Sequence, residues 1–202
     1  MTADLFGLFV VTIAAVSLTP GMCMTLAFSL GLSLGYRKTL WMMAGEMTGV
    51  VVVVSTTVFL LGWLLRLDPV WFNGLAMVGA VYLLWIARQL WMADPELSSQ
   101  GVRGSLTPLS LAALGFTTAI MNPKGWAFMI ALLPGFMDAE RALLPQLFLF
   151  LSVMLTTEFL SLSLYAGGGR WLRRALGEGA PMGALNKIAA VLMVGVSVLV
   201  FV

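Results

Sequence analysis

Long uncharged stretches are the feature that most limits what this chain can fold into. No charged residue interrupts Leu5–Tyr36 or Val70–Ala87, and none follows Lys187. A helix needs about 20 predominantly apolar residues to cross roughly 30 Å of hydrocarbon. Because lipid offers no hydrogen-bonding partners, a chain must cross it with its backbone groups bonded internally, as they are in a helix. These stretches therefore predict membrane-spanning α-helices.

Three further apolar stretches each contain one charged residue, which is Glu46, Lys124 or Glu158. Only 10% of the 202 residues are charged, whereas about a quarter are charged in a soluble domain. We therefore predict an all-α, polytopic membrane protein that forms a single transmembrane domain over residues 1–202. The first span lacks a preceding basic segment and is expected to be retained rather than cleaved as a signal peptide. The six expected spans are Leu5–Leu34, Leu40–Leu65, Val70–Trp91, Pro108–Leu133, Leu143–Gly167 and Leu185–Val202.

Basic residues are unevenly distributed among the short loops. Successive loops lie on alternate sides of the membrane. The loops on one side contain eight Lys or Arg residues, and those on the other side contain two. Because Lys and Arg in short loops stay in the cytoplasm, this bias predicts that both termini lie outside, in the periplasm or the extracellular space. The eight are Arg37, Lys38, Arg88, Arg103, Arg170, Arg173, Arg174 and Lys187, and the two are Arg66 and Arg141.

The chain divides into two related halves. A polar linker, 94–103, is expected in the cytoplasm and separates three spans in 1–93 from three in 104–202, so the halves must insert with opposite orientations. The first span of each half has a proline–glycine break, Thr19-Pro20-Gly21 in one and Asn122-Pro123-Lys124-Gly125 in the other. The second span of each half has a lone glutamate. Inverted repeats with broken helices at corresponding positions are the best sequence indication of a transporter binding site.

The two breaks have a direct physical consequence. A proline removes one backbone hydrogen bond and clashes with the carbonyl four residues earlier, and a neighbouring glycine relaxes the backbone. Either motif alone is also typical of a simple kink. Two helices broken near the midplane would present half-helix N-termini, which attract anions, and free carbonyl groups, which attract cations. An amino acid carries both charges and suits such a site. The candidate substrate-binding residues are Thr19, Pro20, Gly21, Asn122, Pro123 and Lys124.

The three charges within spans are the other functional candidates. A charge near the centre of a membrane helix costs roughly 2.5–3.5 kcal/mol on insertion scales, so such residues usually face a cavity or a partner. Lys124 lies about ten residues, or roughly 15 Å, inside its span. Glu46 and Glu158 are the candidate proton-coupling groups. Two alternatives are that Glu46 sits at the membrane interface, and that an ion pair between Lys124 and a glutamate only holds the helices together.

Small residues indicate where helices meet or turn. The pattern Gly45-x-x-x-Gly49 in the second span predicts close helix packing and also offers a contact face for a homodimer. Gly31 and Gly35 are expected to let the chain turn at the end of the first span. The single cysteine, Cys23, is expected to be a small packing residue or to line a pocket beside the first break.

These motifs resemble those of the lysine-exporter (LysE) superfamily, in particular its homoserine/threonine-efflux (RhtB-type) branch, over essentially the whole chain. Thr19-Pro20-Gly21 is similar to the signature of the family's first span, and Asn122-Pro123-Lys124 is similar to part of its fourth-span signature. The stretch Gly31–Arg37 resembles the family's glycine-flanked basic turn, and Gly79–Trp85 resembles its third-span motif.

The sequence departs from the family pattern at two places. Members commonly follow Thr-Pro-Gly with Pro and then Asn or Asp, whereas Met22 and Cys23 stand here. Members also often have an acidic or polar residue directly after the second glycine of the second span. That place is Val50 here, and Glu46 lies one turn earlier on the same face. The resemblance thus implies a carboxylate moved by one turn and an altered choice of substrate.

The resemblance implies a secondary transporter, not an enzyme, that exports amino acids or related small metabolites across the bacterial inner membrane by proton antiport. The absence of a Gly-x-x-x-x-Gly-Lys-Ser/Thr loop is consistent with secondary transport. The expected partners are the small-molecule substrate, protons and membrane lipid, with no nucleic acid and no cofactor. Lys124 would face the substrate carboxylate, and Glu46 or Glu158 would take the ammonium group or the coupling proton.

Three alternatives to amino-acid export stay open. The same fold would export a divalent or toxic metal cation if intramembrane Glu, Met and Cys residues bound it, but the chain has no His and one Cys, so no metal ligands are predicted. The same shortage disfavours a membrane enzyme or an electron carrier. A non-transporting membrane subunit is the third alternative.

Overall fold

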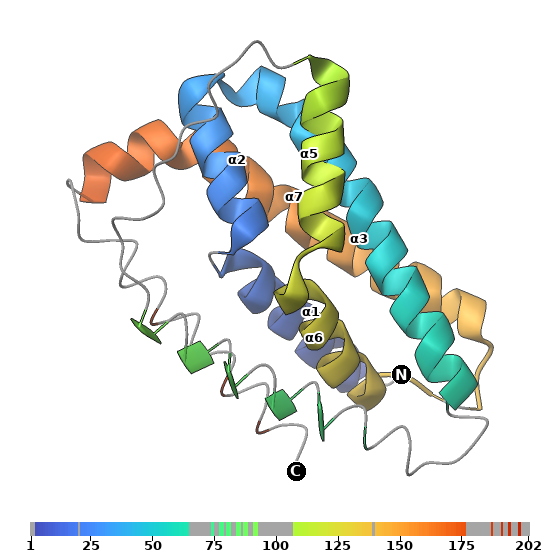
Figure 1. The fold of residues 1–202 in the computed structure, drawn as a ribbon. Helices are drawn as coiled ribbons and strands as arrows, with labels where there is room; N and C mark the ends of the chain where they lie inside the picture. Colours follow the sequence, from blue (N-terminus) through green and yellow to red (C-terminus); the bar gives the residue numbers. More distant parts are fainter. Residues whose placement is uncertain are drawn as a thin grey trace.

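The computed structural model describes residues 3–19, 21–64, 107–138 and 140–176, with isolated positions between 74 and 92 and between 187 and 198. All regular structure in these residues is helical, as the sequence predicts (Figure 1). The helices are α1 (Ala3–Leu18), α2 (Met22–Ser33), α3 (Tyr36–Leu64), α5 (Pro108–Ile120), α6 (Pro123–Leu132), the short 3-10 helix η2 (Leu133–Gly135) and α7 (Leu143–Leu176).

Two of these helices are long and apolar enough to cross a membrane unaided, over Tyr36–Trp63 in α3 and Leu143–Gly168 in α7. They correspond to the predicted second and fifth spans. The pair α1–α2 forms a third candidate span if it is counted as one helix bent by 54°. The predicted third and sixth spans and the linker 94–103 fall wholly or largely outside the described residues, so the count of six spans stays a prediction.

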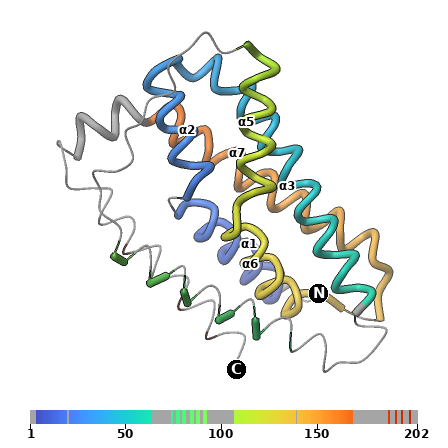
Figure 2. Tube along the Cα trace, in the orientation of Figure 1, coloured from blue at the N-terminus to red at the C-terminus, as the bar shows by residue number. Residues whose placement is uncertain are grey.

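Both predicted helix breaks are present (Figure 2). The first separates α1 from α2 at Thr19–Gly21, with Pro20 itself outside the described residues. The second separates α5 from α6, where Pro123 is the first residue of the new helix. A proline fits this position because its missing N–H would have no partner there. Asn122 caps α6, since its side-chain oxygen accepts a hydrogen bond from the Lys124 amide at 3.1 Å.

Glycines bring α3 and α5 into close backbone contact. A Cβ atom on Gly45 would lie 1.8 Å from the carbonyl oxygen of Ala112, and one on Gly49 would lie 2.6 Å from the Ala119 side chain. Gly115 of α5 approaches the backbone of α3 in the same way. The predicted packing role of Gly45 and Gly49 is therefore confirmed. Their expected role in a homodimer contact is wrong, because this face is already occupied within one chain.

Gly31 and Gly35 have different roles. Gly35 joins α2 to α3 with φ of +82°, a conformation that favours glycine, so it makes the predicted turn. Gly31 lies inside α2, where a Cβ atom would be 2.2 Å from the carbonyl oxygen of Ala166 in α7. The prediction of a turn at Gly31 is wrong, because this residue serves the close packing of two helices.

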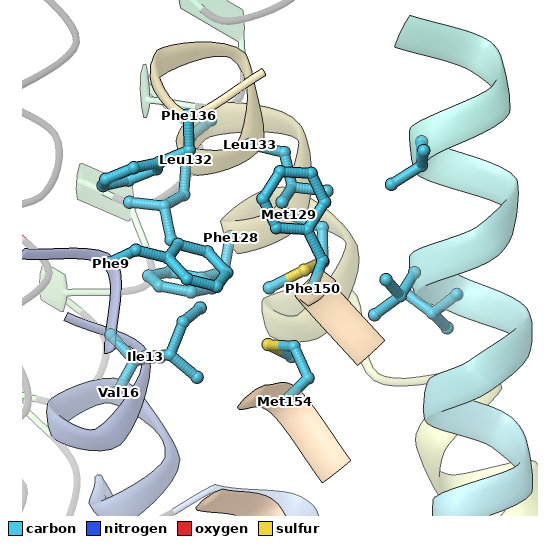
Figure 3. Packing of buried hydrophobic residues seen from close by; sticks show 14 of the residues in the cluster. Phe9, Ile13, Val16, Phe128, Met129, Leu132, Leu133, Phe136, Phe150 and Met154 are labelled. Atoms are coloured by element: carbon cyan, nitrogen blue, oxygen red, sulfur yellow. The ribbon is translucent and has the colours of Figure 1, made fainter. Parts of the chain in front are cut away.

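The buried apolar residues form two clusters. Between them along the helices lies a polar level, which we define as the two helix breaks with Glu46 and Glu158. The aromatic cluster is built from α1, α3, α6 and α7 around Phe9, whose ring lies 5.0 Å from that of Phe136 and 5.1 Å from that of Phe150 (Figure 3). The methionine cluster is built from α2, α3, α5 and α7 and includes Met24, Met42 and Met43. The two breaks and both glutamates lie between the clusters along the chain, which predicts a polar level in the middle of the bundle.

Candidate functional site

The two helix breaks and the three charged residues meet at one cavity of about 80 Å³. A single water molecule needs roughly 10–15 Å³ of such space, so the cavity has room for more than one. Four of the six predicted substrate-binding residues and both predicted proton-coupling residues line it. The lining consists of Ile13, Val16, Ser17, Thr19, Gly21, Cys23, Met24, Glu46, Val50, Val53, Val54, Ala119, Asn122, Lys124, Gly125, Phe128, Met129, Met154 and Glu158.

Of the remaining two predicted binding residues, Pro123 does not add its side chain to this cavity. Pro20 lies outside the described residues. Pro123 is exposed and is not part of the lining. Its contribution is to start α6, which places Lys124 in the first turn of that helix.

Lys124 joins the two breaks. Its Nζ donates hydrogen bonds to the carbonyl oxygen of Thr19 at 3.3 Å and to the hydroxyl oxygen of the same residue. The Thr19 hydroxyl in turn donates to the Val16 carbonyl at 2.6 Å. Gly21 lies beside the ammonium group, because a Cβ atom there would be 3.4 Å from Nζ. The lysine thus spans the two halves of the chain rather than reaching for the membrane surface.

Side chains satisfy the carbonyl groups that lose their helical partners at the breaks. In a continuous helix each carbonyl accepts from the amide four residues later. At the first break the Leu18 carbonyl instead accepts from the Tyr165 hydroxyl at 2.9 Å, and Thr19 accepts from Lys124. At the second break the Ile120 carbonyl accepts from the indole N–H of Trp126 at 2.8 Å. Unpaired backbone groups are costly in hydrocarbon, so these bonds are what allow both breaks to persist at this depth.

Glu46 is the most deeply buried charged residue of the site. Its side chain is 1% exposed, and its Oε2 has no hydrogen-bond partner. It lies in α3 and lines the cavity, whereas its position relative to the membrane interface stays a prediction. A buried carboxylate oxygen without a partner is a free acceptor that points to an absent cation, proton or donor group.

Glu158 of α7 lies in the wall of the cavity that Glu46 and Ser17 also line. Lys124 forms no ion pair with either glutamate, because its ammonium group is more than 4 Å from both carboxylates. Within the described part of the chain the ion pair found is Arg141–Asp138 at 3.0 Å, near the surface. The alternative of a lysine–glutamate ion pair that only holds the helices together is therefore wrong, because Lys124 is hydrogen-bonded to Thr19 instead.

The segment that departs from the family pattern contributes one side chain to the cavity. Cys23 is 4% exposed and lines the cavity, and the Asn122 amide donates to its sulfur at 3.7 Å. Met22 points away and is half exposed. Asn122 therefore has two tasks, since it caps α6 with its oxygen and contacts α2 with its nitrogen.

Sequence reasoning missed two polar residues at the site. Ser17 lines the cavity, and its hydroxyl lies 3.5 Å from that of Thr157. Tyr165 bonds the first break, as described above. Helical spacing contains a signal for both: Tyr165 is seven residues, or two turns, from Glu158, and Ser17 is four residues from Ile13, which also lines the cavity.

Among the residues that the structure describes, no three or more His, Cys, Asp or Glu side chains are grouped so that they could hold a metal ion. The polar groups of the cavity are one ammonium, two carboxyl groups, an amide, two hydroxyls and the thiol of Cys23. Such a set offers both donors and acceptors to a small polar solute.

Comparison with known proteins identifies the family of the chain. Residues 14–202 match the family model of the LysE type translocators. The chain belongs to this family. The resemblance derived from the sequence motifs is thereby confirmed, and the protein is a multi-pass membrane transporter rather than an enzyme.

Several relatives align along nearly their whole length. A membrane protein of Vibrio cholerae is 25% identical over 95% of this chain and 93% of its own. A homoserine/homoserine lactone efflux protein of Salmonella typhi is 24% identical over 93% of this chain and 91% of its own. A leucine efflux protein of Enterobacter sp. (strain 638) is 24% identical over 94% and 92%. No solved structure matches the chain.

Proposed function

We propose that this transporter exports amino acids or closely related small metabolites across the bacterial inner membrane, in exchange for protons. The relatives named for the efflux of homoserine, homoserine lactone and leucine support the class of solute. The observation that carries the proposal is the cavity itself. There a lysine and two glutamates from three helices gather at two helix breaks without forming an ion pair.

The charges of the cavity match those of an amino acid. Lys124 presents its ammonium group to a carboxylate, since two of its three N–H donors are used on Thr19 and the third is left for a substrate. Glu46 presents an unpartnered acceptor to an ammonium group. Because Lys124 and the glutamates are not paired with one another, a zwitterion fits between them without first breaking a salt bridge. A solute with only one charge leaves one side of the cavity uncompensated, which is costly in a poorly solvated site.

The two glutamates provide the means of proton coupling. Both line the same cavity, and two neighbouring carboxyl groups in a buried site are better tolerated with one negative charge than with two. The pair therefore holds one proton when the ammonium group is absent. Binding of the ammonium group stabilises the second negative charge and releases that proton. Substrate and proton thus exclude one another, as antiport requires.

The same proposal includes two inverted three-span repeats, 1–93 and 104–202, with both termini outside. Each half begins with a broken helix, α1–α2 in one and α5–α6 in the other, followed by a long helix with a lone glutamate. Inverted repeats around a midplane site are the usual basis of alternating access in secondary transporters. If the transporter is a homodimer, its contact lies away from the face of Gly45 and Gly49.

Proteoliposomes with an imposed pH gradient test this function. Wild-type protein is expected to move a radiolabelled amino acid against its concentration gradient while protons move the opposite way. Glu158→Gln is expected to abolish the proton-driven accumulation and to leave the protein folded. Glu140→Gln is the matched control, because Glu140 is exposed in the loop before α7. Unchanged coupling in Glu158→Gln would remove this residue from the mechanism, and transport of metal ions without any amino acid would overturn the proposal.

A further inference from the structure

We propose that the preferred substrates are amino acids with apolar side chains of medium size, aliphatic or thioether, that extend from the helix breaks into the aromatic cluster. This inference rests on the proposed function and adds which amino acids are exported. It comes from the division of the cavity lining into a polar part and an apolar part. The apolar part includes six larger side chains, those of Ile13, Val53, Val54, Phe128, Met129 and Met154.

The apolar residues all lie on the same side of the polar level. Met129 follows Lys124 by five residues in α6, and Met154 precedes Glu158 by four residues in α7. At 1.5 Å per residue, these offsets place them about 6 to 8 Å along the helices from the charged groups. The helices run in opposite directions here, so both offsets point to the end of the molecule where α1 begins and α6 ends (Figure 1). Ile13 of α1 is displaced from its break toward the same end.

This apolar part is continuous with the aromatic cluster. Ile13, Met129 and Met154 belong to that cluster and approach one another from three different helices (Figure 3). On the methionine-cluster side, by contrast, the cavity reaches only Cys23 and Met24. A bound amino acid whose charged groups sit between Lys124 and the glutamates therefore has room for its side chain in one direction only.

The chemistry of that direction selects the side chain. None of the six apolar lining residues carries a polar side-chain group that could pair with an amide, ammonium or carboxylate, so such a group would lose its hydration without compensation. An aliphatic or thioether side chain gains from leaving water. The two methionines adapt to chains of different branching, because their side chains are unbranched and flexible.

The first test uses wild-type protein and two substrates of nearly the same shape. The side chains of leucine and asparagine branch at the same atom and differ in polarity. Comparing their transport therefore measures the effect of the apolar part of the cavity on substrate choice. We expect kcat/KM for leucine, and for methionine, to exceed that for asparagine by at least about tenfold, the discrimination that one or two buried apolar groups provide. Equal transport of leucine and asparagine, or a preference for lysine or aspartate, would overturn the inference and leave amino-acid export intact. Absence of any amino-acid transport would instead refute the proposed function.

The second test narrows the wall at one position. Val53→Leu adds a methylene group to the apolar part, whereas Val52→Leu makes the same change on the exposed face of α3. We expect Val53→Leu to lower kcat/KM for the substrate leucine about tenfold more than kcat/KM for the smaller substrate alanine. Val52→Leu is expected to leave kcat/KM for both substrates unchanged. An equal loss for leucine and alanine in Val53→Leu, or no loss at all, would contradict the inference. If Val53→Leu does not fold, as judged by its melting temperature, Val53→Ala replaces it. That variant is expected to shift the preference toward larger apolar substrates, and an unchanged preference would count against the proposal.

Discussion

The substitution Gly45→Ala tests whether the contact between α3 and α5 holds the cavity in shape. The added Cβ atom would lie 1.8 Å from the Ala112 carbonyl oxygen. Close carbon–oxygen contacts in proteins are about 3.3–3.6 Å. The two helices must therefore separate by about 1.5 Å, because the obstructing atom belongs to the backbone and cannot rotate away.

This separation is expected to reduce both stability and transport. Overpacking of a well-packed contact costs about 1–3 kcal/mol, and the backbone clash places Gly45→Ala at the upper end of that range. Glu46 is the next residue and moves with α3, and a misplacement of about 1 Å at a working group can lower a rate on the order of 100-fold. Thermal unfolding in detergent measures the first effect, and amino-acid transport in proteoliposomes measures the second. The particle size is expected to stay the same, since the contact is within one chain.

Gly7→Ala is the matched control for Gly45→Ala. Gly7 also lies in a helix, α1, but nothing is within 4 Å of a Cβ atom built there. We expect this variant to melt at or above the wild-type temperature, because alanine favours a helix by about 1 kcal/mol over glycine. A Gly45→Ala protein with the wild-type melting temperature and transport rate would refute the close approach of α3 and α5.

Three further substitutions test the polar level. Asn122→Ala removes the cap of α6 and is expected to lower the unfolding free energy by about 0.5–2 kcal/mol, while Asn122→Asp keeps the acceptor and most of the stability; denaturant titration distinguishes them. Tyr165→Phe leaves the Leu18 carbonyl unpaired and is expected to cost about 1–3 kcal/mol in the same assay. An amino acid at one hundred times its dissociation constant is expected to raise the unfolding free energy of wild-type protein by about 2.7 kcal/mol, which is seen as a higher melting temperature. Lys124→Met is expected to abolish this stabilisation, and a retained rise in melting temperature would exclude Lys124 from substrate binding.

Local physical chemistry explains what could be predicted from the sequence. The second and fifth spans are predicted over Leu40–Leu65 and Leu143–Gly167, and α3 and α7 cover all the described residues of these ranges. Their apolar length alone is decisive in a membrane. The break at Pro123 was predictable because the ring cannot continue a helix and Asn122 is a strong cap. Each of these signals acts within a few residues of its position.

The pairing of residues far apart in the chain could not be predicted in the same way. Lys124 was expected to face a substrate or a glutamate, and it bonds Thr19, 105 positions earlier. The Gly45-x-x-x-Gly49 pattern identified a packing face without saying which helix packs there. Such choices depend on the distances between whole helices, which no single stretch of sequence contains.

The second departure from the family pattern gains a physical meaning from the cavity. Glu46 and Val50 are one turn apart and both line it, so a carboxylate placed one turn earlier still reaches the site. Position 50 itself adds an apolar side chain to the lining, together with Val53 and Val54. A carboxylate at position 50 would project beside this wall and tolerate polar side chains on the substrate. With the carboxylate at Glu46, the wall is apolar from Val50 onward, which is the arrangement that an aliphatic substrate requires.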